Sequence, residues 1–172
     1  LRLIRLTDAE MELNFSLLTD RLLADLSDPW DSNAMRLLGR NLWVSVRDRL
    51  QAGPVLDWDD RDLYWARLTV KSRLRATASA AGLAAFETAS RGFEDVQFPD
   101  SEAFRVLVTG FDPFHLDEHL DQSNPSGLAA LALDGRFLQT ARGTARVEAA
   151  VFPVRFADFD KGMVEDFFEP RL

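Results

Sequence analysis

The 172-residue sequence contains no cysteine and only two histidines, His115 and His119. The lack of cysteine excludes a disulfide framework and any cysteine nucleophile within this chain. No apolar run reaches the ~20 residues of a membrane span, and the first six residues, LRLIRL, are too short and too charged for a signal peptide. We therefore expect a cytoplasmic protein without a membrane partner. A secreted protein is the alternative, because the sequence does not begin with methionine.

Basic residues are the minority among the charged ones, at 20 Lys and Arg against 28 Asp and Glu, which gives a net charge of −8. The two parts of the chain have the same excess of acidic residues. Residues 104–172 hold seven basic and eleven acidic residues, and residues 1–103 hold thirteen and seventeen. No basic stripe follows from this distribution. Since binding to a phosphate backbone requires clustered Lys and Arg, we expect no nucleic-acid partner.

Residues 1–92 carry apolar residues at helical spacing. The stripes are Leu13, Leu17, Leu18, Leu22 and Leu26, then Met35, Leu38, Leu42, Val46 and Leu50, then Leu63, Val70 and Leu74, followed by an Ala-rich segment from Ala76 to Ala89 that we expect to break near Gly82. All four tryptophans, Trp30, Trp43, Trp58 and Trp65, lie here. We interpret them as core residues, with an aromatic groove for a peptide or sugar as the alternative. The region is predicted to be an all-α packing or regulatory unit.

The pattern changes after an acidic stretch at residues 93–103 that contains Pro99, which we interpret as a linker. Residues 104–172 then alternate between β-branched runs and helical spacing. Strands are predicted at 105–109 and 145–154, and helices at 126–133 and 156–168. A strand–helix–strand–helix order is typical of α/β folds with parallel strands and a right-handed crossover.

The most informative stretch runs from Phe104 to Ser126. A strand ends at Thr109-Gly110 and is followed by Phe111-Asp112-Pro113-Phe114 and then a polar loop. Asn124-Pro125 predicts a helix start, because Asn accepts free backbone N–H groups at the N-cap and Pro fits the first helical position. In open α/β sheets, ligands bind at the ends of the strands where such loops begin.

These residues resemble the N-terminal signature of the pyroglutamyl peptidase I (pyrrolidone carboxyl peptidase) family, V-L-V-T-G-F-x-P-F followed by N-P-[ST]. Residues 106–114 and 124–126 match it, and 151–154 with the helix after them are similar to the family's second strand–helix unit. The sequence departs from the family at His115-Leu116, where Gly-Gly is usual. The resemblance covers 105–172 and implies a three-layer α/β/α sandwich with parallel strands, incomplete in this chain.

The resemblance implies a cysteine peptidase that removes N-terminal pyroglutamyl residues from peptides. In the family a Cys thiolate attacks the amide, a His acts as base and acid, a Glu orients the His, and no metal or organic cofactor takes part. These three residues follow the second strand–helix unit. This chain contains no Cys, so we expect no catalytic residue in it and no activity from it alone. The alternative is a non-catalytic binding or interaction module built on a truncated peptidase-like domain.

Three residues are candidates for substrate binding by resemblance. Phe111 and Phe114 correspond to the family's two rings that line the apolar slot for the pyroglutamyl lactam, and Asn124 borders the slot. Without the resemblance, the sequence around Phe111 and Phe114 indicates side chains that only pack in the fold, and Asn124 indicates a helix N-cap.

The segment from His115 to Asp121 places two His residues four positions apart among carboxylates, a spacing that can support zinc. The segment is not an H-E-x-x-H motif, because its glutamate, Glu118, precedes the second histidine, His119, instead of following the first, His115. We interpret the segment as a solvated acidic loop and expect no metal site. A triad of His119 with Ser123 or Ser126 is disfavoured, because no nucleophile-elbow pattern surrounds either serine.

Strands of parallel sheets are buried on both faces and need neighbours on both sides. If the chain ends at Leu172, its two strands lack those neighbours. We therefore expect a homo-oligomer, or a longer chain whose remainder covers the strands. The expected partner of the parent protein is a peptide with an N-terminal pyroglutamate.

Overall fold

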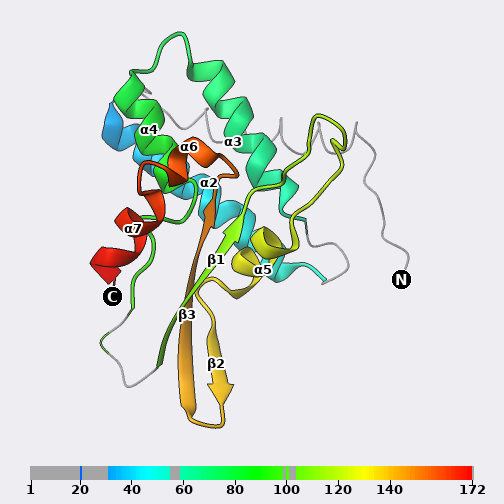
Figure 1. The fold of residues 1–172 in the computed structure, drawn as a ribbon, viewed down its shortest axis with the longest axis vertical. Coiled ribbons are helices and arrows are strands. Elements are labelled where there is room, and N and C mark those ends of the chain that lie inside the picture. The colour runs from blue at the N-terminus through cyan, green and yellow to red at the C-terminus, as the bar shows by residue number, and fades with distance from the viewer. Residues whose placement is uncertain (1–19, 21–30, 55–58, 99, 101–103, 172) are drawn as a thin grey trace.

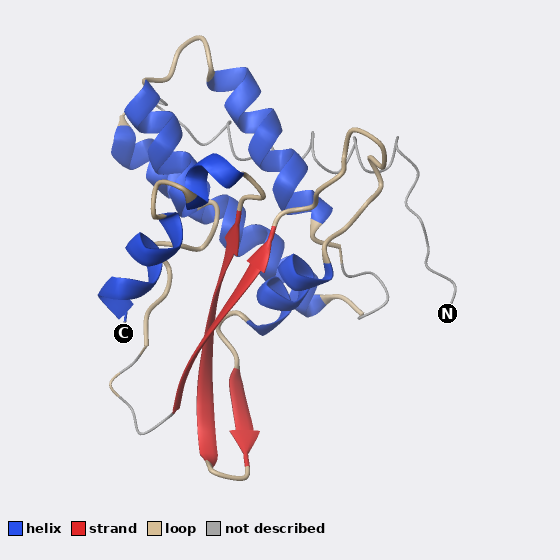
Figure 2. Cartoon of the chain, viewed as in Figure 1, coloured by secondary structure: helices blue, strands red, loops and turns tan. Residues whose placement is uncertain are grey.

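The computed structural model describes residues 20, 31–54, 59–98, 100 and 104–171. The stripe predicted between Leu13 and Leu26 lies outside these residues, as do Trp30 and Trp58. Among the described residues, helices gather around one end of a small sheet, and the β2–β3 hairpin extends away from them (Figures 1 and 2). No helix in this part of the chain is long and apolar enough to cross a membrane.

The helices before the sheet follow the apolar spacing of the sequence. Helix α2 spans Ser32–Ala52 and is capped by Asp31, whose carboxylate accepts the backbone N–H of Asn33 at 3.0 Å. Helix α3 spans Arg61–Leu74 and α4 spans Ala80–Ala89. The predicted break near Gly82 was wrong. The Ser79 side chain caps α4 by accepting the Gly82 N–H, so this glycine lies in the first turn.

The sheet has the strand order β1-β3-β2 over the described residues. Strands β1 (Phe104–Phe111) and β3 (Gly143–Phe152) are parallel, as predicted, with Val106 opposite Val147. Strand β2 (Phe137–Thr140) is antiparallel to β3 and was missed by the sequence analysis, which makes the expectation of parallel strands alone wrong. The β2–β3 turn depends on Gly143, whose φ of 124° suits glycine.

Helix α5 (Pro125–Leu133) connects β1 to the β2–β3 hairpin and begins where Asn124-Pro125 predicted it. The helix predicted over 156–168 is instead two short helices, α6 (Phe156–Phe159) and α7 (Met163–Phe168), followed by the 3-10 turn η2 (Glu169–Arg171). Gly162 separates them, because its φ of 79° is left-handed and cannot continue an α-helix.

Neighbouring residues of β3 face different clusters of side chains. Ala149 and Val151 pack with the apolar faces of α2, α3, α4 and α5, whereas Ala150 and Phe152 pack with Phe167 of α7. The first cluster contains residues from both sides of the expected linker at 93–103. The helices of the N-terminal region therefore share one core with the sheet rather than forming an appendage with a core of its own.

Candidate functional site

A pocket of about 560 Å³ lies at the ends of the two parallel strands. Helices α3 and α4 lie beyond the points where β1 and β3 finish (Figure 1). On one side the pocket is lined by Glu87 of α4, by Arg91 just after α4 and by four residues of α3, Tyr64, Arg67, Leu68 and Lys71. On the other side it is lined by residues 112–116 after β1 and 153–156 after β3. The strand ends thus contribute one side of the pocket and the N-terminal helices the other.

Asp112, the first residue after β1, is held by two buried arginines. Its carboxylate accepts Arg67 Nη1 at 2.9 Å and lies 2.8 Å from Arg91 Nη1, and all three side chains are at most 5% exposed. Arg67 also donates to the Ser90 hydroxyl and carbonyl, at 3.0 and 3.1 Å. These bonds attach the loop that follows β1 to α3 and α4.

Glu87 extends the network toward solvent. Its carboxylate accepts Arg91 Nη2 at 2.6 Å and Lys71 Nζ at 2.5 Å. Burial alone would raise the pKa of Glu87, but the charges of Arg91 and Arg67 and the hydrogen bond from Lys71 lower this pKa to about 2. Glu87 is therefore ionised at neutral pH.

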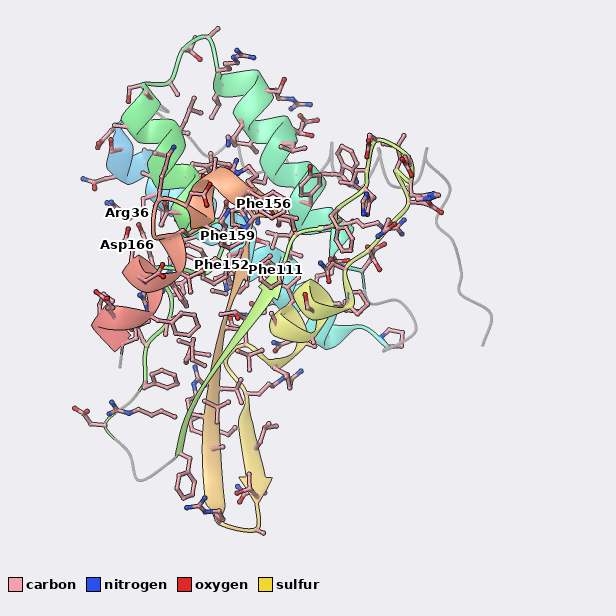
Figure 3. All side chains as sticks on the ribbon, in the orientation of Figure 1. Arg36, Phe111, Phe152, Phe156, Phe159 and Asp166 are labelled. Carbon is pink, nitrogen blue, oxygen red and sulfur yellow. The ribbon has the colours of Figure 1, made fainter. Side chains whose placement is uncertain are left out.

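Phe111 and Phe114 both lie at the end of β1, and their side chains are 39% and 40% exposed. They point to different places. Phe114 lines the pocket beside His115, with ring centroids 5.0 Å apart. Phe111 packs instead near Phe152 and Phe159, each with centroids 6.2 Å away (Figure 3). The structure thus does not bring the two predicted slot residues into one described pocket.

Asn124 is 7% exposed, and its amide bonds are made within the chain. Its Oδ1 accepts the backbone N–H and the hydroxyl of Ser126, at 3.1 and 2.8 Å, and its Nδ2 donates to the Asp112 carbonyl at 3.0 Å. The N-cap role is confirmed. A substrate-binding role for Asn124 stays a prediction.

His115 takes a left-handed backbone conformation with φ of 58°. The pyroglutamyl peptidase family that this stretch resembles usually has glycine at this position. Glycine adopts a left-handed φ without steric cost. The loop after it, including Asp117, Glu118 and His119, is exposed, as expected for a solvated acidic loop. Within the described ranges, no three His, Asp or Glu side chains converge as metal ligands.

The charged residues of the pocket were missed by the sequence analysis. One signal was available for Arg67, which occupies a core-facing position of the stripe that includes Leu63, Val70 and Leu74. A charged residue inside an apolar helical stripe requires a partner, because burial of an unpaired charge is costly. Its partner Asp112 lies 45 positions away, so the sequence alone does not identify it.

A second buried carboxylate, that of Asp60, supports the start of α5. It is 4% exposed and accepts the Asn124 backbone N–H at 3.0 Å. Burial raises the pKa of Asp60 from 3.8 to about 7, although the hydrogen bond from Asn124 opposes the shift. The unfolded chain loses this proton at lower pH than the folded protein does. The stabilising contribution is therefore complete below pH 4 and is lost as the pH rises through 7.

We predict that this titration is visible in the free energy of unfolding. Lowering the pH from 8 to 5 should stabilise the wild type by about 2–3 kcal/mol more than an Asp60→Asn variant, which keeps an acceptor without the proton equilibrium. Urea unfolding at both pH values measures this difference. The exposed Asp160→Asn should behave as the wild type. Equal pH dependence in the wild type and Asp60→Asn would show that the buried carboxylate titrates normally.

Comparison with known proteins finds similarity to one family model, which matches the C-terminal part of the chain, where the strand ends that line the pocket lie. The family described as "PA0049, C-terminal domain" matches residues 105–172. The relative "Uncharacterized protein PA0049" of Pseudomonas aeruginosa is 38% identical over 160 residues, which cover 77% of this chain and 29% of the relative. The chain thus spans about three tenths of that relative's length. No solved structure matches the chain.

The similarity to PA0049 extends into the helices that line the pocket. Residues 105–172 are 68 of the 172 residues, whereas the alignment with PA0049 covers 77% of the chain. The aligned part of this chain therefore includes residues before the C-terminal domain. The sequence similarity thus covers residues both before and after position 105.

Proposed function

We propose that this chain supplies the N-terminal part of a pyroglutamyl-peptidase-like α/β domain, and that the pocket at the end of β1 holds the substrate's pyroglutamyl ring. The observation that carries the proposal is the position of the T-G-F-D-P-F string. Its threonine, glycine and first phenylalanine are the last three residues of β1, and Phe114 lines a pocket at the ends of two parallel strands. A flat, neutral lactam buries favourably against an aromatic face.

Two further features support the same proposal. Helix α7 packs on one face of β3 and helices including α2 and α5 pack on the other, which agrees with an incomplete α/β/α sandwich. His115 adopts the backbone conformation suited to the glycine usual at this position. In this proposal Asp112 fixes the loop that carries Phe114, and the cysteine, histidine and glutamate of the mechanism belong to the remainder of a longer protein.

The edge of the sheet fits that arrangement. Strand β1 pairs only with β3 among the described residues, and its Phe104 and Val106 side chains are 44% and 38% exposed. An unpaired strand edge with apolar side chains is a template for association. We propose that the remainder of the longer chain, or a second copy of the protein, pairs with β1.

The proposed activity is tested on the full-length protein with pyroglutamyl-7-amido-4-methylcoumarin. We expect release of the fluorophore that is abolished by a thiol-alkylating reagent, and no release by the 172-residue chain, which has no cysteine. Turnover that persists after alkylation would contradict the cysteine mechanism. A full-length protein that neither turns over nor binds the substrate would contradict the peptidase proposal itself.

The role of Phe114 is tested in the same assay. Phe114→Ala should raise KM about 10-fold, since an aromatic contact contributes roughly 1–1.5 kcal/mol. The melting temperature should change little, because the ring is 40% exposed. Phe137→Ala, which removes an exposed ring from β2, is the matched control and should leave KM unchanged. A large loss of thermal stability with an unchanged KM would assign Phe114 to the core.

A further inference from the structure

The pocket wall contributed by the N-terminal helices carries more cations than carboxylates. Arg67, Lys71 and Arg91 surround Glu87 and Asp112. Arg155 also reaches the pocket, 3.7 Å from Glu87, but it is paired with Asp158 at 2.5 Å. Among these side chains and Asp158, four cations face three carboxylates, which leaves one positive charge in excess.

The two carboxylates of the cluster are already occupied by its own cations. Both oxygens of Asp112 are held by Arg67 and Arg91, and both oxygens of Glu87 by Arg91 and Lys71. The side chains of Arg67 and Arg91 are only 2% and 4% exposed. An uncompensated positive charge beside such buried groups is unfavourable, and a bound anion would compensate it.

Two cations of the pocket are open enough to receive that anion. The side chains of Lys71 and Arg155 are 30% and 51% exposed. Both approach the same carboxylate, that of Glu87, at 2.5 and 3.7 Å, so they lie close to each other. An ammonium group has three donors, and Glu87 uses one of those of Lys71.

Apart from Tyr64 and His115, the rest of the lining is apolar and includes Leu68, Phe114, Val154 and Phe156. A concave site with an apolar lining and few charged groups is typical of a site for a small organic molecule. A single excess charge matches a carboxylate better than a doubly charged phosphate. The apolar lining also favours a ligand in which the charged group is attached to a hydrocarbon or ring.

We propose that this pocket binds a small organic monoanion, with its carboxylate between Lys71 and Arg155 and its apolar part against Leu68 and Phe114. The carboxylate belongs either to a free acid or to the C-terminus of a short peptide. The inference does not depend on peptidase activity.

Calorimetric titration of the full-length protein with benzoate and benzamide tests the charge requirement without a lactam. Benzoate should bind at least 10-fold more tightly than benzamide. Lys71→Met and Arg155→Gln should each weaken benzoate binding about 10-fold. Either change leaves equal numbers of cations and carboxylates in the cluster. Arg75→Gln, an exposed cation beyond the end of α3, should leave it unchanged. The melting temperature of each variant reports whether it is folded.

Equal affinities for benzoate and benzamide, or variants at Lys71 and Arg155 that bind as the wild type does, would overturn the proposal. Inorganic phosphate that competes as well as benzoate would overturn the assignment to an organic monoanion. N-acetyl-Gly-Gly-Phe binding more tightly than benzoate would assign the carboxylate to a peptide C-terminus, and the reverse order would assign it to a free acid. Benzoate binding by a protein without pyroglutamyl turnover would separate this inference from the proposed peptidase.

Discussion

Replacing Asp112 with asparagine should lower the free energy of unfolding by about 3–5 kcal/mol, which is the usual effect of removing one partner from a buried ion pair. Asp112 is 3% exposed and is shared by Arg67 and Arg91. Without its charge, three cations remain around Glu87 alone, and two of them are almost completely buried. The amide of asparagine keeps one acceptor but does not offset their charge.

Urea unfolding of Asp112→Asn and of a matched variant, Asp117→Asn, measures this effect. Asp117 lies in the same loop but is exposed, so its replacement should change the free energy of unfolding by less than about 0.5 kcal/mol. A similar, small change in both variants would show that the arginines are solvated or paired elsewhere. The loss of Asp112 should also detach the loop that carries Phe114, because Asp112 attaches that loop to α3 and α4.

Gly110→Ala should destabilise the protein by about 3 kcal/mol or more, because the added methyl group has no space. A Cβ at this position of β1 would lie 2.3 Å from the Ser126 carbonyl oxygen and 2.7 Å from the Gly127 Cα. Both contacts are with backbone, so the clash cannot be relieved by a change of rotamer. The start of α5 would have to move away from β1, and the hydrogen bond from Phe111 N to Ser126 Oγ, 3.1 Å long, would be lost.

Gly53→Ala is the control for this substitution. Gly53 has a φ of −81°, and a Cβ there would be 3.4 Å from its nearest neighbour, the Arg49 carbonyl oxygen. The melting temperature of the Gly53→Ala variant should therefore stay close to that of the wild type. A Gly110→Ala protein that melts like Gly53→Ala would show that β1 and α5 are not packed as closely as the structure has them. Their contact also explains why this glycine ends the β-branched run. The sequence pattern predicted that the strand ends at Thr109-Gly110, but β1 continues to Phe111.

Local patterns were sufficient to predict the elements whose formation depends on neighbouring residues. The apolar spacing from Met35 to Leu50 predicted α2, and Asn124-Pro125 predicted the first turn of α5. The β-branched run at Val106–Val108 predicted β1. Strand β2 was missed because all four of its residues are exposed, so it shows no apolar alternation. Its pairing comes from the β2–β3 turn and from backbone bonds to β3, which leave no pattern of side chains.

The sequence by itself thus determined the helices α2, α3 and α4 of the N-terminal region, the parallel β1–β3 pair and the position of the T-G-F-D-P-F string at the end of a strand. Those features depend on helical periodicity, capping and β-propensity, which act over a few residues. Only the tertiary structure decided that Phe111 and Phe114 point to different places and that Arg67 meets Asp112 across 45 residues. These outcomes depend on how α3 and α4 pack over the strand ends, and long-range packing is set by the topology rather than by neighbouring residues.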